Sequence, residues 1–221
     1  MLRKIICILP LLVACQTMLG QCLESVGIRY GLTVSTLRSK SPEGEAMFNG
    51  QQQGHAALLS LRSSRCGKWG VRTDLGYVQK GGWWGWSGPG LGSTQAPLQA
   101  RHSYLSISPM LEFRREFGRL ELRGFGGPRM DLQLAYTSNH PYMDGYRSFW
   151  DPVWGGTYGG GIGHSFGRST IVAEYQGRPD LSVYGNGIEG SGGMRSHSHT
   201  WLIGLVHEFD GTCKRPVKGS E

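Results

Sequence analysis

Alternation of apolar and polar residues runs through most of the chain. In the segment 26–35, valine, isoleucine, tyrosine and leucine hold the even positions, and small or polar residues hold the odd ones. A period of two places successive side chains on opposite faces of a β-strand. Similar patterns recur along the chain. They predict eight strands, at 26–35, 55–61, 69–78, 101–114, 119–134, 157–166, 169–178 and 197–209.

The connections between these strands alternate between long and short. The long ones are 36–54, 79–100, 135–156 and 179–196, and the short ones are 62–68, 115–118 and 167–168. Outer-membrane barrels have this rhythm, because short periplasmic turns alternate with longer extracellular loops. About 9–11 tilted residues cross a bilayer as a strand. We therefore predict an all-β fold, an eight-stranded antiparallel up-and-down transmembrane β-barrel.

Aromatic residues fall near both ends of the predicted apolar face. One set lies at the expected periplasmic ends of the strands: Trp69, Phe113, Phe166 and Phe209. The other set lies at the expected extracellular ends: Tyr77, Tyr158, Tyr175 and Trp201. Two aromatic girdles around an apolar band are typical of a barrel that faces lipid.

The opposite face carries most of the charge. Its ionisable residues are Arg29, Arg72, Asp74, Glu112, Arg114, Arg119, Glu121, Arg123, Arg129, Asp131, Glu174, Arg178 and Glu208. An eight-stranded barrel is only wide enough inside for side chains. We therefore predict that these nearly balanced charges pair inside the barrel as a plug rather than a channel. Pro109 and Pro128 predict bulges or strand ends, because proline cannot donate a ladder hydrogen bond.

The N-terminus has the pattern of an export signal. Arg3 and Lys4 precede a short apolar run at 5–13, which is too short to span a bilayer as a helix. Gly20 favours cleavage by an ordinary signal peptidase, while a lipobox-like sequence ending at Cys15 keeps lipidation open. We predict a signal peptide at 1–20, a barrel domain at 21–209 and a polar tail at 210–221, in a protein of the cell outer membrane.

Composition excludes several other classes of protein. The chain has 36 Gly, 7 Trp, 9 Tyr and 7 Phe among 221 residues, with 18% charged residues. It is too aromatic for a disordered chain, its glycines lack the collagen period, and it has no run of 18 apolar residues. The formal charge of +7 is not gathered in a long basic run, which argues against a nucleic-acid partner.

The cysteines do not have the spacing of a metal site. Cys22, Cys66 and Cys213 remain after removal of the signal, without CxxC spacing or histidine partners. A disulfide between Cys22 and Cys213 stays open. We predict no metal and no cofactor.

Five segments resemble a known family. They are WGVRTDLGYVQKGG (69–82), YLSISPMLEFRREFG (104–118), LRGFGGPRMDLQL (122–134), YGGGIGHSFG (158–167) and IVAEYQGRPDLS (171–182). Their order and spacing are similar to those of the OmpX/OmpA-like outer membrane protein β-barrel domain family of Bacteroidetes. The resemblance implies a small outer-membrane barrel with no catalytic residues to carry over. The polar tail after Phe209 departs from barrels that end on an aromatic residue.

Tryptophans concentrate in two of the predicted long loops. They are Trp83, Trp84, Trp86, Trp150 and Trp154. Exposed aromatic side chains on a loop favour partner binding. The alternative is that they pack over the barrel mouth or extend a girdle. We expect a monomer whose partners are outer-membrane lipids and an extracellular or envelope protein.

His197, Ser198, His199 and Glu208 are residue types that a hydrolase would use. In a regular strand Ser198 faces away from both histidines, and Glu208 lies roughly 30 Å along the strand from His199. A hydrolase needs these groups within hydrogen-bond reach. We therefore predict a non-enzymatic surface or scaffold protein. A lipid-modifying enzyme of the lipid A deacylase type and a secreted soluble ligand-binding barrel are the alternatives.

Overall fold

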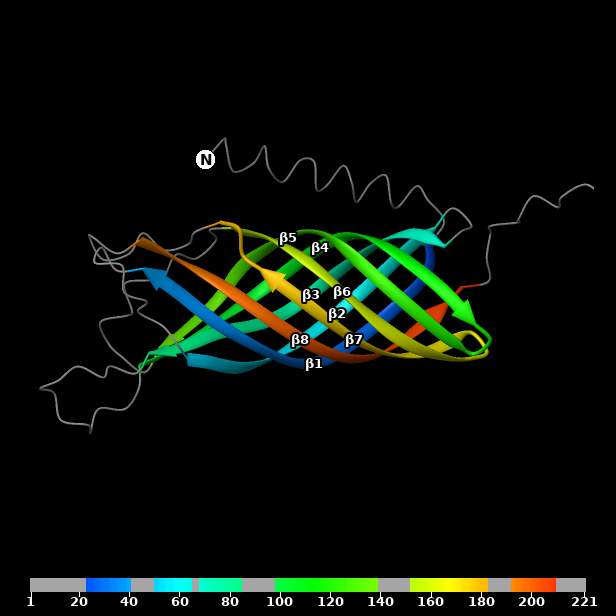
Figure 1. The fold of residues 1–221 in the computed structure, drawn as a ribbon, viewed down its shortest axis with the longest axis horizontal. Coiled ribbons are helices and arrows are strands. Elements are labelled where there is room, and N and C mark those ends of the chain that lie inside the picture. The colour runs from blue at the N-terminus through cyan, green and yellow to red at the C-terminus, as the bar shows by residue number, and fades with distance from the viewer. Residues whose placement is uncertain are drawn as a thin grey trace, which may run out of the picture.

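The computed structural model describes residues 23–40, 50–64, 68–84, 98–138, 152–182 and 192–209. They form eight strands (Figure 1): β1 Leu23–Lys40, β2 Gly50–Ser64, β3 Trp69–Trp84, β4 Leu98–Phe117, β5 Leu120–Ser138, β6 Pro152–Phe166, β7 Ser169–Pro179 and β8 Gly192–Glu208. The predicted signal peptide and tail lie outside the described residues, as do Cys22, Cys66 and Cys213.

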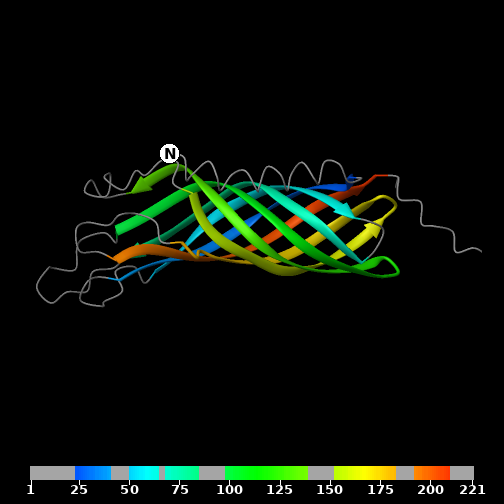
Figure 2. The ribbon, with the colours of Figure 1, turned by 90° about the horizontal axis from the view of Figure 1, so that it is seen from above.

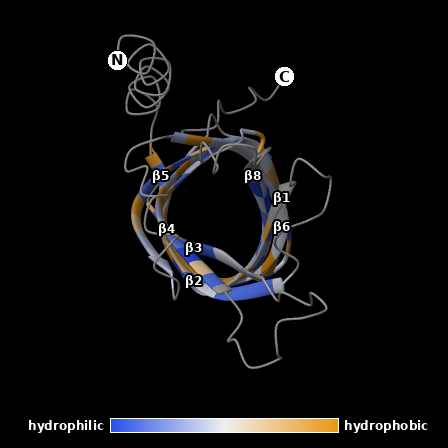
Figure 3. Cartoon of the chain, turned by 90° about the vertical axis from the view of Figure 1, so that its left-hand side faces the viewer, coloured by the Kyte–Doolittle hydropathy of each residue, from blue (hydrophilic) through white to orange (hydrophobic). Residues whose placement is uncertain are grey.

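The strands close into a single antiparallel barrel. Each strand pairs with its neighbour in the chain, and β8 pairs with β1 to complete the ring. Seen end-on in Figure 3, the ring is closed on all sides. The predicted fold class is confirmed. Among the described residues, no helix is both long enough and apolar enough to span a bilayer.

The outside of the barrel is apolar and the inside is polar. The most exposed large side chains include Ile28 and Ile203, each 69% exposed, and they alternate with buried inward residues such as Arg29 and Leu202. Buried apolar side chains also lie on the inside, and four of them, Ala56, Leu58, Val78 and Leu202, form a small cluster. The period of two that predicted the strands therefore separates a lipid-like exterior from a polar core.

The strands are longer than predicted. β4 has 20 residues and β5 has 19, against about 9–11 needed to cross a bilayer. The segments 79–84, 98–100, 135–138 and 152–156 were expected in long loops but belong to strands. The reason is that ladder hydrogen bonds continue beyond the apolar band, where alternation in hydrophobicity no longer marks a strand. Figures 1 and 2 show the resulting elongated cylinder of inclined strands.

Two of the short connections are two-residue turns at the same end of the barrel. Gly118 joins β4 to β5 and Gly167 joins β6 to β7, each with a φ of 65°. This left-handed conformation is accessible to glycine without steric cost. The strand ends that the long connections join therefore all lie at the opposite end, which is called the long-connection end below.

The prolines were predicted to make bulges or strand ends, and that prediction is wrong. Pro109 lies within β4 opposite Thr73, and Pro128 lies within β5 opposite Gly156. On one side of the prolines Ile107 of β4 pairs with Met130 of β5, and on the other side Leu111 pairs with Gly126. The pairing of β4 with β5 therefore keeps the same register across the prolines. The two missing donors thus fall at one place in the sheet, and the flanking pairs preserve the register.

Strands β1 and β3 contact each other directly toward the long-connection end of the barrel. The register of β2 against β3 shifts between Gln51 and Ala56. There the Ser35 hydroxyl donates to the carbonyl of Gly81 at 2.9 Å and accepts from its N–H at 2.7 Å. Buried Leu37 packs beside Gly82, and a Cβ atom added to Gly82 would lie 3.0 Å from the leucine side chain.

Close backbone approach makes Gly31 a test of this packing. A Cβ atom on Gly31 would lie 1.8 Å from the carbonyl oxygen of Trp201, whereas nothing lies within 4 Å of a Cβ atom on Gly124. We expect Gly31→Ala to lower the free energy of unfolding by about 1–3 kcal/mol and Gly124→Ala to change it by less than about 0.5 kcal/mol. Urea unfolding of vesicle-inserted protein, followed by tryptophan fluorescence, measures both. Equal values for the two variants would contradict the close approach.

Candidate functional site

Arg72 is the centre of a buried ion-pair network. It projects inward from β3 and is 1% exposed. Its guanidinium donates to both oxygens of Asp74 at 2.8 Å, to Glu112 of β4 at 2.9 Å and to Glu174 of β7 at 2.9 Å. It also stacks on Phe125 of β5, with 4.2 Å to the ring centroid. One side chain thereby links β3, β4, β5 and β7 across the interior.

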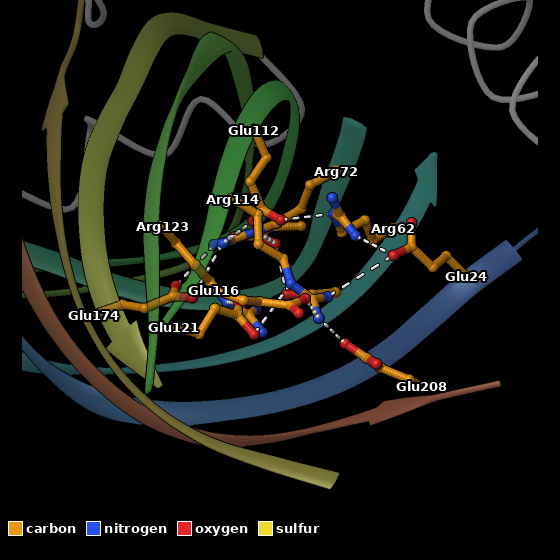
Figure 4. A network of polar contacts seen from close by, with 12 residues as sticks. Glu24, Arg62, Arg72, Glu112, Arg114, Glu116, Glu121, Arg123, Glu174 and Glu208 are labelled. Atoms are coloured by element: carbon orange, nitrogen blue, oxygen red, sulfur yellow. Dashed lines mark hydrogen bonds and ion pairs between the residues drawn. The ribbon is translucent and has the colours of Figure 1, made fainter. Parts of the chain in front are cut away.

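Two further arginines extend this network around the barrel wall. Arg29 of β1 pairs with Glu174 at 3.1 Å and donates to Ser60, whose hydroxyl donates to Asp74 at 2.5 Å. Arg62 of β2 pairs with Glu112 at 2.8 Å and with Glu24 of β1. Figure 4 shows Glu24, Arg62, Arg72, Glu112 and Glu174 of this network with their side chains inside the barrel.

Arg114 carries the network to the short-turn mouth. Its guanidinium lies 3.1 Å from Glu121 and 2.8 Å from Glu116, and it also pairs with Glu208 of β8. Glu121 pairs in turn with Arg123. Glu208 is half-buried, so this end of the network meets solvent. The arrangement ties β4, β5 and β8 together at the mouth (Figure 4).

A second buried cluster lies toward the other end. Lys80 of β3 donates to Asp131 of β5 at 2.6 Å and to Asp180 at 2.8 Å. Arg129 of β5 pairs with the same two carboxylates. Arg178 of β7 donates to Ser106 and lies 3.6 Å from Asp131. All five charged groups are less than 10% exposed.

Most of the charged residues that were predicted to face the interior are buried there. Those buried inside the barrel are Arg29, Arg72, Asp74, Glu112, Arg114, Glu121, Arg123, Arg129, Asp131, Glu174 and Arg178. Arg119 was predicted inside and is exposed, because it is the second residue of a two-residue turn and projects from the end of the barrel. Since a buried charge without a partner is strongly destabilising, the pairing accounts for their placement.

The sequence reading missed several members of the clusters. Arg62 was expected in the short connection 62–68, and Lys80 and Asp180 were expected in long loops, but all three are buried. Strand boundaries drawn at the ends of the apolar band excluded them. Continued alternation past Tyr77 would have placed Lys80 on the same face as Val78, which lines the interior.

The outward face carries ordered polar pairs at the long-connection end. The hydroxyl of Tyr30 lies 3.0 Å from Nδ1 of His55, and the hydroxyl of Tyr175 contacts Nδ1 of His199. At the other end Trp69 packs against Phe113, with ring centroids 5.0 Å apart. Two aromatic belts therefore border the apolar band, and the belt at the long-connection end includes histidine.

The candidate tryptophans lie partly in strands rather than in loops. Trp83 is in β3, 41% exposed, and its ring occupies the space where Gly50 of β2 lacks a side chain. Trp84 ends β3, and Trp154 lies in β6, where its carbonyl accepts from the N–H of Ser182. These positions correct the predicted loop placement, because the ladder extends past the belt. Trp86 and Trp150 lie outside the described residues.

Ser198 and the histidines beside it in the chain lie on opposite sides of the barrel wall. Ser198 is fully buried in the interior, where its hydroxyl donates to the carbonyl of Arg178 at 3.5 Å. His197 and His199 are half-buried on the outer wall. A serine and its base need a direct hydrogen bond, which the barrel wall prevents here. In the described ranges, no group of three or more His, Cys, Asp or Glu could hold a metal ion.

Comparison with solved structures decides the type of barrel. The outer membrane protein OprG from Pseudomonas aeruginosa superposes with a TM-score of 0.55, covering 86% of this chain and 98% of that one at 12% identity. The chain has the fold of a small outer-membrane β-barrel. Ail, the attachment invasion locus protein of Yersinia pestis, is also similar, with a TM-score of 0.45 and 15% identity over 85% of this chain and 100% of its own. No family model and no curated protein matches the sequence.

The buried network predicts a strong dependence on Arg72. Arg72→Met leaves Asp74, Glu112 and Glu174 without their common partner, and we expect a loss of about 3–5 kcal/mol in the free energy of unfolding. Arg119→Met, at the exposed turn, is the matched control and should change it by less than about 0.5 kcal/mol. Urea unfolding in vesicles measures the difference. A stability loss that is equal in the two variants would show that the network contributes nothing specific.

Proposed function

We propose that this protein is an integral outer-membrane β-barrel that acts as a non-enzymatic surface anchor and binds a partner through its long-connection end. The observation that carries this proposal is the band of large apolar side chains exposed around the whole barrel. Ile28 and Leu32 of β1, Ile162 of β6, Ile171 of β7 and Ile203 of β8 are each more than half exposed. Monomeric soluble proteins rarely expose contiguous apolar patches of this extent.

The filled interior supports an anchor rather than a channel. Arg29, Arg72, Arg129 and Arg178 are all less than 2% exposed, although arginine is among the largest side chains. An eight-stranded barrel is wide enough only for its own side chains. The paired charges also tie opposite walls together, so a rigid cylinder is favoured over a gated pore.

The part of the barrel beyond the outer belt supports binding at that end. Strand β3 continues from Tyr77 in the belt to Trp83, six residues farther along. At about 3.3 Å per residue this places Trp83 roughly 20 Å from the belt along the strand. An exposed tryptophan on a rigid strand can contribute large contact area at low entropic cost. Its position favours a partner outside the membrane.

The proposal also includes membership of a family and export by a signal peptide. The five resembling segments support membership of the OmpX/OmpA-like family of Bacteroidetes, and four of them form most of β3, β4, β5 and β6. The N-terminal charged and apolar run supports export by a signal peptide. The separation of Ser198 from the outward histidines supports a non-enzymatic role over lipid hydrolysis.

A charge placed in the apolar band tests membrane insertion. In a bilayer, Ile203→Arg should lower the free energy of unfolding by about 2–4 kcal/mol. In a soluble barrel the same exposed site would change it by less than about 0.5 kcal/mol. Gln51→Arg, on the outer wall beyond the belt, is the matched control and should behave like the wild type.

Migration in detergent gels before and after boiling, called heat modifiability, reports whether the wild type and each variant are folded. The wild type and Gln51→Arg should migrate differently before and after boiling, and the wild type should require detergent or lipid to stay folded. A wild-type protein that is soluble without detergent, with Ile203→Arg equally stable, would overturn the membrane assignment and favour a secreted barrel.

A substitution of Trp83 tests partner binding. Trp83→Ala should reduce crosslinking of surface partners on intact cells by about tenfold or more, because hot-spot aromatics contribute at least about 2 kcal/mol. Trp69→Ala should leave crosslinking unchanged, because Trp69 lies at the opposite end of the barrel, although it is more exposed than Trp83, at 59% against 41%. Both variants should keep heat modifiability. Loss of crosslinking in Trp69→Ala alone would place the partner at the short-turn end and overturn the proposed orientation.

A further inference from the structure

The outward face of β8 changes character step by step along the strand. Alternate residues from the long-connection end read Arg195, His197, His199, Trp201, Ile203 and Leu205. Ile203 and Leu205 are exposed in the apolar band, and Trp201 lies in the aromatic belt. The two histidines and the arginine therefore follow the belt in the direction of the lipid head groups.

The histidines are held together on this face. The ring centroids of His197 and His199 lie 4.6 Å apart in an edge-on arrangement. His199 also stacks beside Tyr175 of β7, with ring centroids 5.8 Å apart, and Tyr175 packs against Trp201 at 5.7 Å. The outer histidine cluster is defined here as Tyr175, Arg195, His197 and His199.

Tyrosine contacts determine which ring nitrogen can act on a ligand. The hydroxyl of Tyr175 is hydrogen-bonded to Nδ1 of His199, so Nε2 is the ring nitrogen that can face an outside ligand. Tyr30 and His55, two strands away from His199 across β1, repeat the arrangement. In both pairs the tyrosine fixes the orientation of the imidazole ring on the outer wall.

A tyrosine of β6 covers the glycine that lies beside His199. Gly177 of β7 pairs directly with His199, and Tyr158 of β6 pairs with Gly177 on its other side. The ring of Tyr158 lies over Gly177, where a Cβ atom would come within 2.7 Å of its hydroxyl. A second phenolic hydroxyl is thereby brought to the strand next to the histidine cluster.

We propose that the outer histidine cluster binds the phosphate group of a membrane lipid in the outer leaflet. The cluster combines the guanidinium of Arg195 with the two imidazoles of His197 and His199, and both kinds of group complement a phosphate. On the outward face of β7 and of β8, the described residues include no carboxylate that would compete for these donors. The site lies beside the aromatic belt, at the depth where head-group phosphates lie. This proposal rests on the proposed membrane insertion.

Native mass spectrometry of the full-length protein in maltoside detergent tests the site, because that detergent contains no phosphate. The probes are diphosphoryl lipid A and the same lipid with both phosphates removed. We expect the wild type to bind the phosphorylated lipid at least about tenfold more tightly. The double variant His197→Gln and His199→Gln should lose that preference, and Tyr175→Phe should reduce it.

The matched control is the double variant His164→Gln and His207→Gln. These two exposed histidines also lie on the outer wall, but at the short-turn end. The control should bind phosphorylated lipid like the wild type. An equal loss in both double variants would overturn the proposal, as would equal binding of the two lipids by the wild type. Inorganic phosphate that displaces the lipid completely would instead indicate a soluble-anion site and overturn the lipid assignment.

Heat modifiability separates this proposal from the proposed function. If every variant still shifts on boiling but none distinguishes the two lipids, the barrel is membrane-inserted and the phosphate site is wrong. If the wild type itself shows no shift and needs no detergent, the membrane assignment fails first.

Discussion

The pairing of charge inside a narrow cylinder filled by its own side chains is the constraint on which the rest of this structure depends. Arg72 satisfies it by binding Asp74, Glu112 and Glu174 at once, so that groups from β3, β4 and β7 meet at one guanidinium. Replacing such a network with apolar side chains can be neutral for stability, but removing one partner leaves buried charge uncompensated. The network therefore requires one register of the sheet, because a slip of one residue would turn every charge toward lipid.

The same constraint explains the inside-out composition. With polar groups committed to the interior, the apolar residues of each strand face outward and need lipid around them. The strands then continue past the apolar band, and the second cluster of Lys80, Arg129, Asp131, Arg178 and Asp180 fills the interior farther along. Near this level the Ser35 bridge to Gly81 joins β1 to β3. The barrel is thus a reinforced cylinder with a rigid extension, well suited to holding a binding surface away from the membrane.

The two proposed functions both use the outside of the barrel. Trp83 offers aromatic contact area beyond the belt for the proposed partner, and the outer histidine cluster is proposed to bind lipid head groups. The two surfaces are carried by different strands, β3 for the first and mainly β8 for the second. Their separation means that lipid contact and partner binding can be tested independently in one protein.

Much of the fold was predictable from sequence alone, because a two-residue period and a long–short rhythm of connections are local signals. Alternation identified all eight strands and placed residues such as Arg29 and Glu174 on the inner face. Those signals fade where the strand leaves the lipid, so Lys80, Asp180 and Trp83 were assigned to loops although they lie in or beside strands. The prediction that Arg119 faces the interior was wrong for the opposite reason, because this turn residue was counted as part of a strand. Only the closed tertiary structure decided which charge pairs with which, and that Tyr175 orients His199, because those partners are set by the cross-strand register and not by proximity in the chain.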